Sequence, residues 1–303
     1  MINTSFSSAN LANSDFRNGD LTNAILASAD LTNADFTGTT LSNTMWIDGN
    51  RYDSITDIPE ISDCELVPYA YCAGADLSYM DLSGMDLTGI DLRGANLQNA
   101  TFDYATLDGA DLRSIFASNA TFIGTWMNET YLQNANLQYA DLTSAKLRHA
   151  DLTNAHLQET VLKYAYFHHA DLTGAEFKDA DMNRVWLEYA DLTNADLSDA
   201  VLYSAFMVGA DLTNADLAGA NLDSANLGLA DLTGANLKDA KLSYAQLYSA
   251  DLTNANLRDA DLTNANLQYA DFTSATVSGA DFTGTTWSET RWIDGNLYNT
   301  NQA

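Results

Sequence analysis

The chain has 303 residues and a formal net charge of −28, with 41 Asp and Glu against 13 Lys and Arg. This charge argues against nucleic acid and anionic membranes as direct partners, because both would be repelled. No apolar run approaches the length of a membrane span and no signal peptide is visible, so we expect a soluble, cytoplasmic protein.

The first predicted segment, residues 1–50, carries a large apolar side chain at every fifth position. Its nine members are Phe6, Leu11, Phe16, Leu21, Leu26, Leu31, Phe36, Leu41 and Trp46. Repeat units depend on stacked neighbours, and nine short units are too few to stand alone. We therefore expect this segment to stack on the rest of the chain or on another molecule.

Residues 51–69 break the register. Trp46 and the next register residue, Cys72, lie 26 residues apart, which is one more than a multiple of five. The interval also holds both prolines of the chain, Pro59 and Pro68. We expect a loop, or a hinge between two repeat modules.

The two cysteines of the chain lie on and beside this loop, at Cys64 and Cys72. Two cysteines do not make a disulfide framework. The sequence leaves open whether they form a single bridge or remain a reduced pair.

The main repeat occupies residues 70–303. From Cys72 to Leu297, every fifth residue belongs to one register of 46 positions, and 32 of these are Leu. A period of five fits neither a helix nor a strand. It fits a coil with five-residue sides, in which Leu and a preceding Ala face inward and Asp, Asn, Thr and Gly cover the outside.

The repeated pattern, as in "ADLTNADLSDAVLYSA", resembles the pentapeptide-repeat family and its A(D/N)LXX motif over nearly the whole chain. The resemblance implies an all-β, right-handed, four-sided β-helix of about 11 to 14 coils, with little or no α-helix. It also favours a bacterial source. With four sides to a coil, residues 20 apart should lie on adjacent coils.

An acidic ladder follows one side of the expected coil. Each member precedes Thr by two residues, and the seven members are Asp151, Asp171, Asp191, Asp211, Asp231, Asp251 and Asp271. The simplest interpretation is that each Asp caps local backbone or bonds its Thr. An alternative is a negative rail that mimics DNA, as the resemblance to fluoroquinolone-resistance members implies, with an enzyme such as DNA gyrase as its target.

An aromatic–basic stripe departs from the repeat on another side. Its members are Trp126, Lys146, Arg148, Tyr166, His168, His169, Trp186, Glu188, Tyr189 and Phe206. Exposed aromatic and basic residues are typical of protein-binding sites, so we expect an unidentified protein partner here. The alternative is that the aromatic rings only stabilise the ladder by stacking.

We find no sequence pattern for catalysis. The chain lacks a nucleophile–base pair, a glycine-rich phosphate loop and zinc-ligand spacing, so we expect no enzyme activity, no cofactor and no metal site. The favoured interpretation is a non-catalytic scaffold or interaction rod. Besides DNA mimicry, end-to-end self-assembly into a homo-oligomer is a further alternative, because solenoid ends expose strand edges.

A "WIDGN" phrase occurs twice, with its two tryptophans 246 residues apart. Both fall at inward positions, each at the end of a run of repeats. We expect Trp46, Trp287 and Trp292 to cap the ends of the apolar columns, with "DGN" supplying the turn by which the chain leaves the coil.

Overall fold

The computed structural model describes residues 3–7, 9, 11, 14–26, 29, 31, 34, 36, 38–46, 51–52 and 64–301. These residues contain no helix, and so none that could cross a membrane. Their strands are four short elements, β1 (Thr44–Met45), β2 (Arg51–Tyr52), β3 (Thr290–Arg291) and β4 (Leu297–Tyr298). The remaining regular structure consists of isolated bridges.

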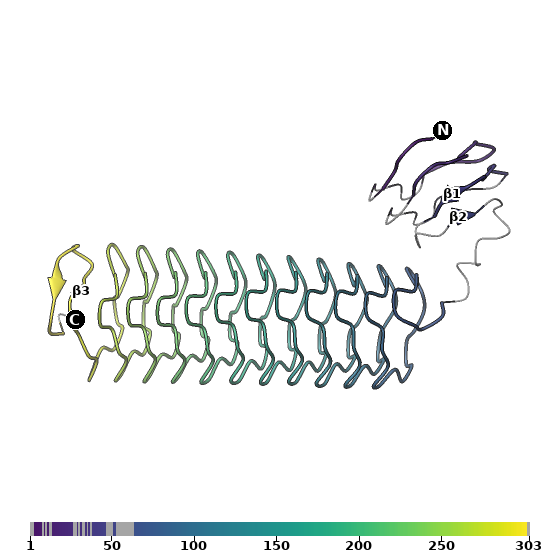
Figure 1. Cartoon of the computed structure of the whole chain (residues 1–303). Coiled ribbons are helices and arrows are strands. Elements are labelled where there is room, and N and C mark those ends of the chain that lie inside the picture. The colour runs from purple at the N-terminus through teal and green to yellow at the C-terminus, as the bar shows by residue number, and fades with distance from the viewer. Residues whose placement is uncertain are drawn as a thin grey trace.

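Residues 71–292 form a regular coil seen side-on in Figure 1. Parallel bridges join residues 20 apart, so that Tyr71 pairs with Asp91 and Asp91 pairs with Asp111. The column from Tyr71 to Arg291 contains eleven such bridges. This confirms the predicted all-β solenoid, with 20 residues in each coil.

Each side of the coil is closed by a tight turn, as the side that begins at Asp91 shows. The Leu92 carbonyl accepts a hydrogen bond from the Ala95 N–H at 2.9 Å, which closes a β-turn. Gly94, the third residue of the turn, has φ of 64°. The Leu92 N–H donates to the Asp111 carbonyl of the next coil at 2.8 Å. Each five-residue repeat therefore contains one β-turn and donates a backbone hydrogen bond to the next coil.

The interior of the coil is a continuous apolar column from Cys72 to Trp292. Leu92 and Ala95 are both fully buried, as are nearly all their equivalents. Where Thr replaces the inward Ala, its hydroxyl finds a backbone acceptor. Thr125, for example, donates to the Phe102 carbonyl at 2.7 Å, which offsets the cost of burying a polar group.

The N-terminal segment has a core of its own. Its buried residues include Phe16, Leu21, Leu26 and Trp46. Parallel bridges again link residues 20 apart, as between Ser5 and Ile25. Most of the predicted loop at 51–69 lies outside the described residues, and the three domain boundaries stay predictions.

The structure corrects the end of the register. Leu297 was expected at an inward position, but it lies in β4, is 56% exposed and pairs antiparallel with Arg291. The reason is that the chain reverses between Trp292 and Asn296, where the Trp292 N–H donates to the Asn296 carbonyl at 2.9 Å. The inward column therefore ends at Trp292.

Candidate protein-interaction site

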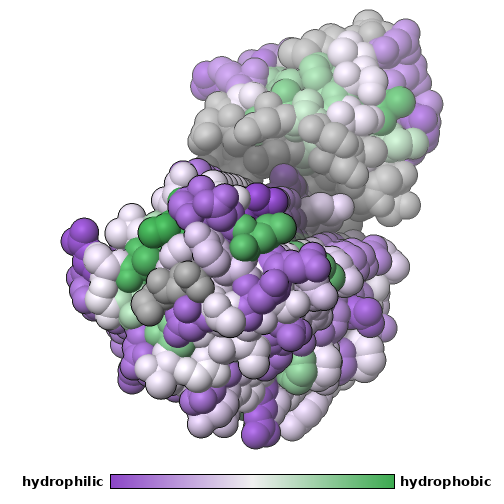
Figure 2. Space-filling model, turned by 90° about the vertical axis from the view of Figure 1, so that its left-hand side faces the viewer, coloured by the Kyte–Doolittle hydropathy of each residue, from purple (hydrophilic) through white to green (hydrophobic). Residues whose placement is uncertain are grey.

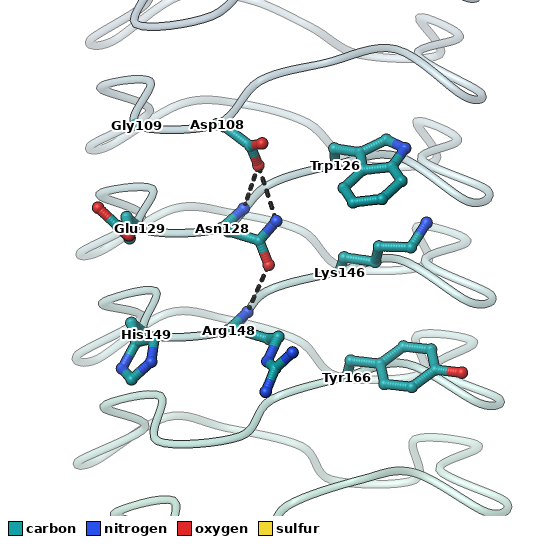
Figure 3. A pocket seen from close by; sticks show the side chains of 9 residues that line it. All are labelled: Asp108, Gly109, Trp126, Asn128, Glu129, Lys146, Arg148, His149 and Tyr166. Atoms are coloured by element: carbon teal, nitrogen blue, oxygen red, sulfur yellow. Dashed lines mark hydrogen bonds between the residues drawn. The ribbon is translucent and has the colours of Figure 1, made fainter.

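Five residues of the aromatic–basic stripe lie in one column. Successive parallel bridges join Trp126 to Lys146, Lys146 to Tyr166, Tyr166 to Trp186 and Trp186 to Phe206. Because each occupies the outward position before an inward Leu, Phe or Met, the backbone ladder holds them one coil apart. Figure 3 shows three of them, Trp126, Lys146 and Tyr166, on consecutive coils.

The side chains of this column contact one another face to face. The Tyr166 and Trp186 rings lie 5.8 Å apart at 10°, and the Trp186 and Phe206 rings lie 4.1 Å apart at 14°. The Lys146 ammonium sits 3.8 Å from the centre of the Trp126 ring, a cation–π contact. Stacking half-buries Tyr166, Trp186 and Phe206, while Trp126 at the end of the column is 46% exposed.

A second aromatic column lies at the neighbouring corner. The His149 and His169 rings stack at 5.1 Å and 3°, and the His169 and Tyr189 rings stack at 5.3 Å and 10°. Ring nitrogens lie in the ring planes, so parallel stacking does not aim both histidines at one shared ion. Among the described residues no group of three or more His, Cys, Asp and Glu is arranged to hold a metal.

His168 fills the space beside the first column. Its ring lies 6.2 Å from Tyr166 and 5.8 Å from Trp186, and its Nε2 lies 3.2 Å from Oε2 of Glu188. These two atoms are within ion-pair distance but lack hydrogen-bond geometry, and Nδ1 of His168 is buried without a partner. Burial lowers the pKa of His168, against the opposing effect of Glu188, so the imidazole is neutral at pH 7.

A surface groove of about 820 Å³ opens along the beginning of the stripe. Trp126, Lys146 and Tyr166 line one wall, as Figure 3 shows. The opposite wall carries a hydrogen-bonded series in which Asp108 accepts from the Asn128 N–H at 2.7 Å, and Asn128 accepts from the Arg148 N–H at 3.3 Å. The groove gives the stripe a concave part that a ligand could enter.

Sequence reasoning missed the polar wall of this groove. Asp108, Asn128 and Glu129 were not selected, although Asp108 and Asn128 lie 40 and 20 residues before Arg148 in the same column. Extending each selected column by one or two coils would have found them.

The members of the acidic ladder are stacked on successive coils, and each carboxylate accepts a hydrogen bond from a backbone N–H of its own turn. Parallel bridges join its members in sequence, and Oδ1 of Asp211 accepts the Thr213 N–H at 2.9 Å. The same contact recurs at all seven members, with distances of 2.8 to 3.0 Å. This local role is a sufficient reason for Asp at these positions.

The three cap tryptophans are buried. Trp46 is 3% exposed in the N-terminal core, and Trp287 and Trp292 are 8% and 6% exposed at the C-terminal end of the rod, with rings 5.0 Å apart. Figure 2 looks onto this end, where hydrophobic residues lie among hydrophilic ones. Ile293 and Leu297, both in the terminal reversal, are exposed there.

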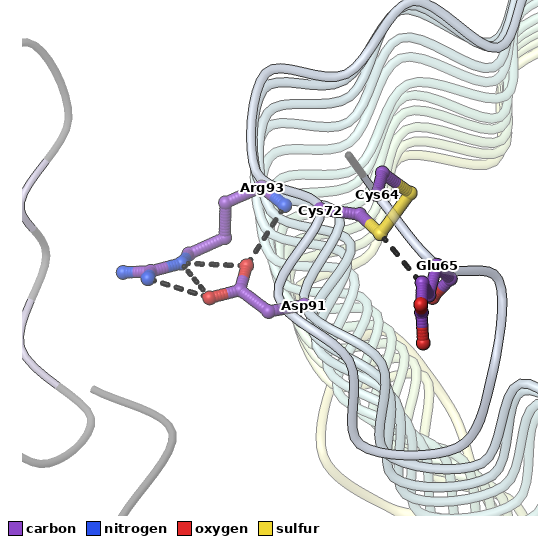
Figure 4. Close-up of a disulfide and its surroundings, with 5 residues drawn as sticks. All are labelled: Cys64, Glu65, Cys72, Asp91 and Arg93. Carbon is purple, nitrogen blue, oxygen red and sulfur yellow. Dashed lines mark hydrogen bonds and ion pairs between the residues drawn. A yellow bond between two sulfur atoms is a disulfide. The ribbon is translucent and has the colours of Figure 1, made fainter. Parts of the chain in front are cut away.

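The Cys64–Cys72 pair, which the sequence left open, is a disulfide in the structure, with its Cα atoms 4.9 Å apart. Cys72 occupies the first inward position of the rod and Cys64 packs against the same core (Figure 4). The bridge therefore fastens the entering chain to the first coil. Disulfides are rare in a reducing cytosol, so the bridge argues against the predicted cytoplasmic location. That location stays a prediction.

Comparison with known proteins identifies the repeat. The family model for pentapeptide repeats, in 8 copies, matches residues 4–43, 75–113, 118–154, 150–187, 180–217, 210–245 and 245–284. No curated protein matches the chain.

Several solved structures are similar. The chain is 33% identical to HetL, a pentapeptide repeat protein involved in heterocyst differentiation regulation from the cyanobacterium Nostoc sp. strain PCC 7120, over 74% of this chain and 92% of HetL, with a TM-score of 0.30. It is 32% identical to a pentapeptide repeat protein from the thylakoid lumen of Arabidopsis thaliana, over 40% of this chain and 70% of that one, with a TM-score of 0.19. It is 21% identical to QnrB1, a plasmid-mediated fluoroquinolone resistance protein, over 69% and 91% of the two chains, with a TM-score of 0.30.

Proposed function

Since this chain belongs to the pentapeptide-repeat family, we propose that it is a non-catalytic scaffold that binds a protein partner through the aromatic–basic stripe. The supporting observation is the stacked column of Tyr166, Trp186 and Phe206, continued by Lys146 over Trp126. Elsewhere the outward positions of the rod carry mainly Asp, Asn and Thr. Aromatic residues and Arg dominate the binding energy of protein interfaces.

Stacking alone does not account for the whole stripe. If the aromatic column served only stability, both faces of each ring should be covered by other side chains. This holds for Trp186, which stacks between Tyr166 and Phe206. Trp126, at the end of the first stack, is 46% exposed, and Tyr189, at the end of the second stack, is 57% exposed. A partner that covers these exposed surfaces would gain buried apolar area, which is the main source of affinity.

The test compares two double variants as baits for a partner captured from a lysate of the source organism. Tyr166→Asn with Trp186→Asn should weaken binding at least about 30-fold, because each truncated hot spot typically costs about 2 kcal/mol or more. The matched control, Tyr244→Asn with Tyr269→Asn, removes two exposed tyrosines from other parts of the rod. Circular dichroism must show the fold retained in both. Equal capture by both double variants and the unaltered protein would refute the proposal.

A further inference from the structure

Lys146 and Arg148, two cations that line the groove beside Trp126, form no ion pair within the described part of the chain. Several other basic side chains of the rod form ion pairs: Lys163 lies 2.8 Å from Asp181, Arg113 lies 2.5 Å from Asp111 and Lys238 lies 2.8 Å from Asp239. Among the described residues, no carboxylate is within ion-pair distance of Lys146 or Arg148. Lys178, Arg184, Lys241 and Arg258 also form no ion pair with a described residue, and what distinguishes Lys146 and Arg148 is that both line the same groove.

The two carboxylates that line the groove, Asp108 and Glu129, form no ion pair with these cations. Asp108 is engaged by Asn128, accepting from its backbone N–H at 2.7 Å and its side-chain amide at 3.0 Å. Figure 3 shows that the side chains of Glu129 and Lys146 lie at opposite rims of the groove. Lys146 and Arg148 therefore have no direct carboxylate contact that an incoming anion would have to displace.

We infer that the partner of the proposed stripe presents a short, extended acidic segment that includes an aromatic residue. This inference rests on the proposed function, because the same stripe is its binding surface. Carboxylates of the segment pair with Lys146 and Arg148, and its aromatic side chain packs on Trp126 or Tyr166. Charge-assisted bonds from Arg and Lys to carboxylates are among the strongest that proteins make, and they are frequently bidentate at Arg.

Charge and size both require the segment to be short. The chain as a whole carries a charge of −28, which repels any extended acidic surface, so attraction is confined to the groove. The groove reaches from Asp108 to Tyr166, which spans about three coil steps of ~4.8 Å. An extended peptide covers that distance with about four residues, at roughly 3.3 Å each.

The experiment selects binders from a phage-displayed library of random 12-residue peptides, with the whole chain as bait. We expect the selected peptides to be enriched in Asp and Glu and to contain an aromatic residue. The best peptide is then labelled, and its affinity is measured by fluorescence polarisation. Lys146→Gln with Arg148→Gln removes both charge-assisted contacts and should weaken binding at least about tenfold, the effect expected from losing either contact alone. Lys238→Gln with Arg258→Gln makes the same charge change outside the groove and should leave the affinity unchanged.

A variant with reversed charges distinguishes the loss of charge complementarity from unfolding of the protein. Lys146→Glu with Arg148→Glu should lose the acidic peptide and gain a version of it in which Lys replaces each acidic residue. Enrichment of neutral or basic peptides, or equal affinities of the groove variant and its control, would overturn the inference.

The proposed function is separable from this inference. If Tyr166→Asn with Trp186→Asn abolishes partner capture while Lys146→Gln with Arg148→Gln does not, the stripe binds a partner of different chemistry. In that case only the inference fails. If neither pair affects capture, both fail.

Discussion

At the scale of single residues, one hydrogen bond explains the most frequent polar residue of the repeat. Asp at the outward position accepts the backbone N–H two residues later, as Asp211 does from Thr213 at 2.9 Å. Asn serves the same purpose elsewhere, and Oδ1 of Asn221 accepts the Asp223 N–H at 3.1 Å. Short side chains with an acceptor oxygen favour such turns, which is why the motif tolerates Asp or Asn here.

The contact at Asp211 predicts different effects of two substitutions. Asp211→Ala leaves the Thr213 N–H without its acceptor and should lower the free energy of unfolding by about 1 kcal/mol. Asp211→Asn keeps the acceptor oxygen and removes one charge from the ladder, so its effect should stay within about 0.5 kcal/mol. Urea or thermal unfolding of the two variants measures the difference. Equal losses would mean that charge, and not the hydrogen bond, matters at this position.

At the scale of elements, the repeated phrase forms the same hairpin twice. In the first copy Thr44 pairs with Tyr52, and in the second Thr290 pairs with Tyr298, so the partners are offset by the same 246 residues. In the second copy Gly295 has φ of 79° and its carbonyl accepts from the Arg291 guanidinium at 2.8 Å. The chain therefore ends a coil by folding back on itself, and the buried Trp46 and Trp292 lie at the start of each reversal.

The opposite end of the main rod is closed by the disulfide, which leads to a prediction about stability. Cys64→Ser should lower the stability of the first coil by about 2 kcal/mol, because the bridge closes a short loop in the unfolded chain. Cys72 keeps its buried position in this variant. In a repeat protein the loss should remain local.

Hydrogen exchange can detect that local loss. Amides of residues 69–91 should exchange faster in the variant, and in the unaltered protein under a dithiol reductant, while amides of the central coils keep their rates. Unchanged exchange near Cys72 in both cases would show that the bridge does not stabilise the first coil.

At the scale of the whole molecule, the charge of the rod makes DNA mimicry the main competing hypothesis. Residues 64–303 hold 32 acidic and 11 basic residues, a net charge of −21. Spread over eleven coil steps of ~4.8 Å, this is one charge per about 2.5 Å, compared with one per ~1.7 Å in duplex DNA. The acidic ladder differs from a phosphate backbone, however, because each Asp already bonds its own turn.

A gyrase supercoiling assay distinguishes the two functions. If the rod is a scaffold that binds through the aromatic–basic stripe, purified protein at micromolar concentration should neither inhibit gyrase nor protect it from a fluoroquinolone. Inhibition that disappears when Asp191, Asp211 and Asp231 are changed together to Asn would instead support mimicry by the ladder. The stripe variant Tyr166→Asn with Trp186→Asn serves as the control that leaves the ladder intact.

The sequence alone determined the fold because the repeat is local and regular. A five-residue period fixes which side chains face inward, and four sides make residues 20 apart neighbours, as the bridge from Trp126 to Lys146 shows. The composition of the stripe and of the ladder could therefore be predicted column by column. The same rule failed at Leu297, because it assumes that the coil continues and the chain reverses there.

Only the tertiary structure decided how the members of each column contact one another. The sequence placed Tyr166, Trp186 and Phe206 together, but whether their rings project outward or stack depends on side-chain conformations set by neighbours one coil away. The groove at Trp126 and the Cys64–Cys72 bridge arise from such contacts between coils and across the entering chain. A periodic sequence specifies the position of each residue along the rod, whereas packing and pairing in three dimensions specify the surface that a partner would contact.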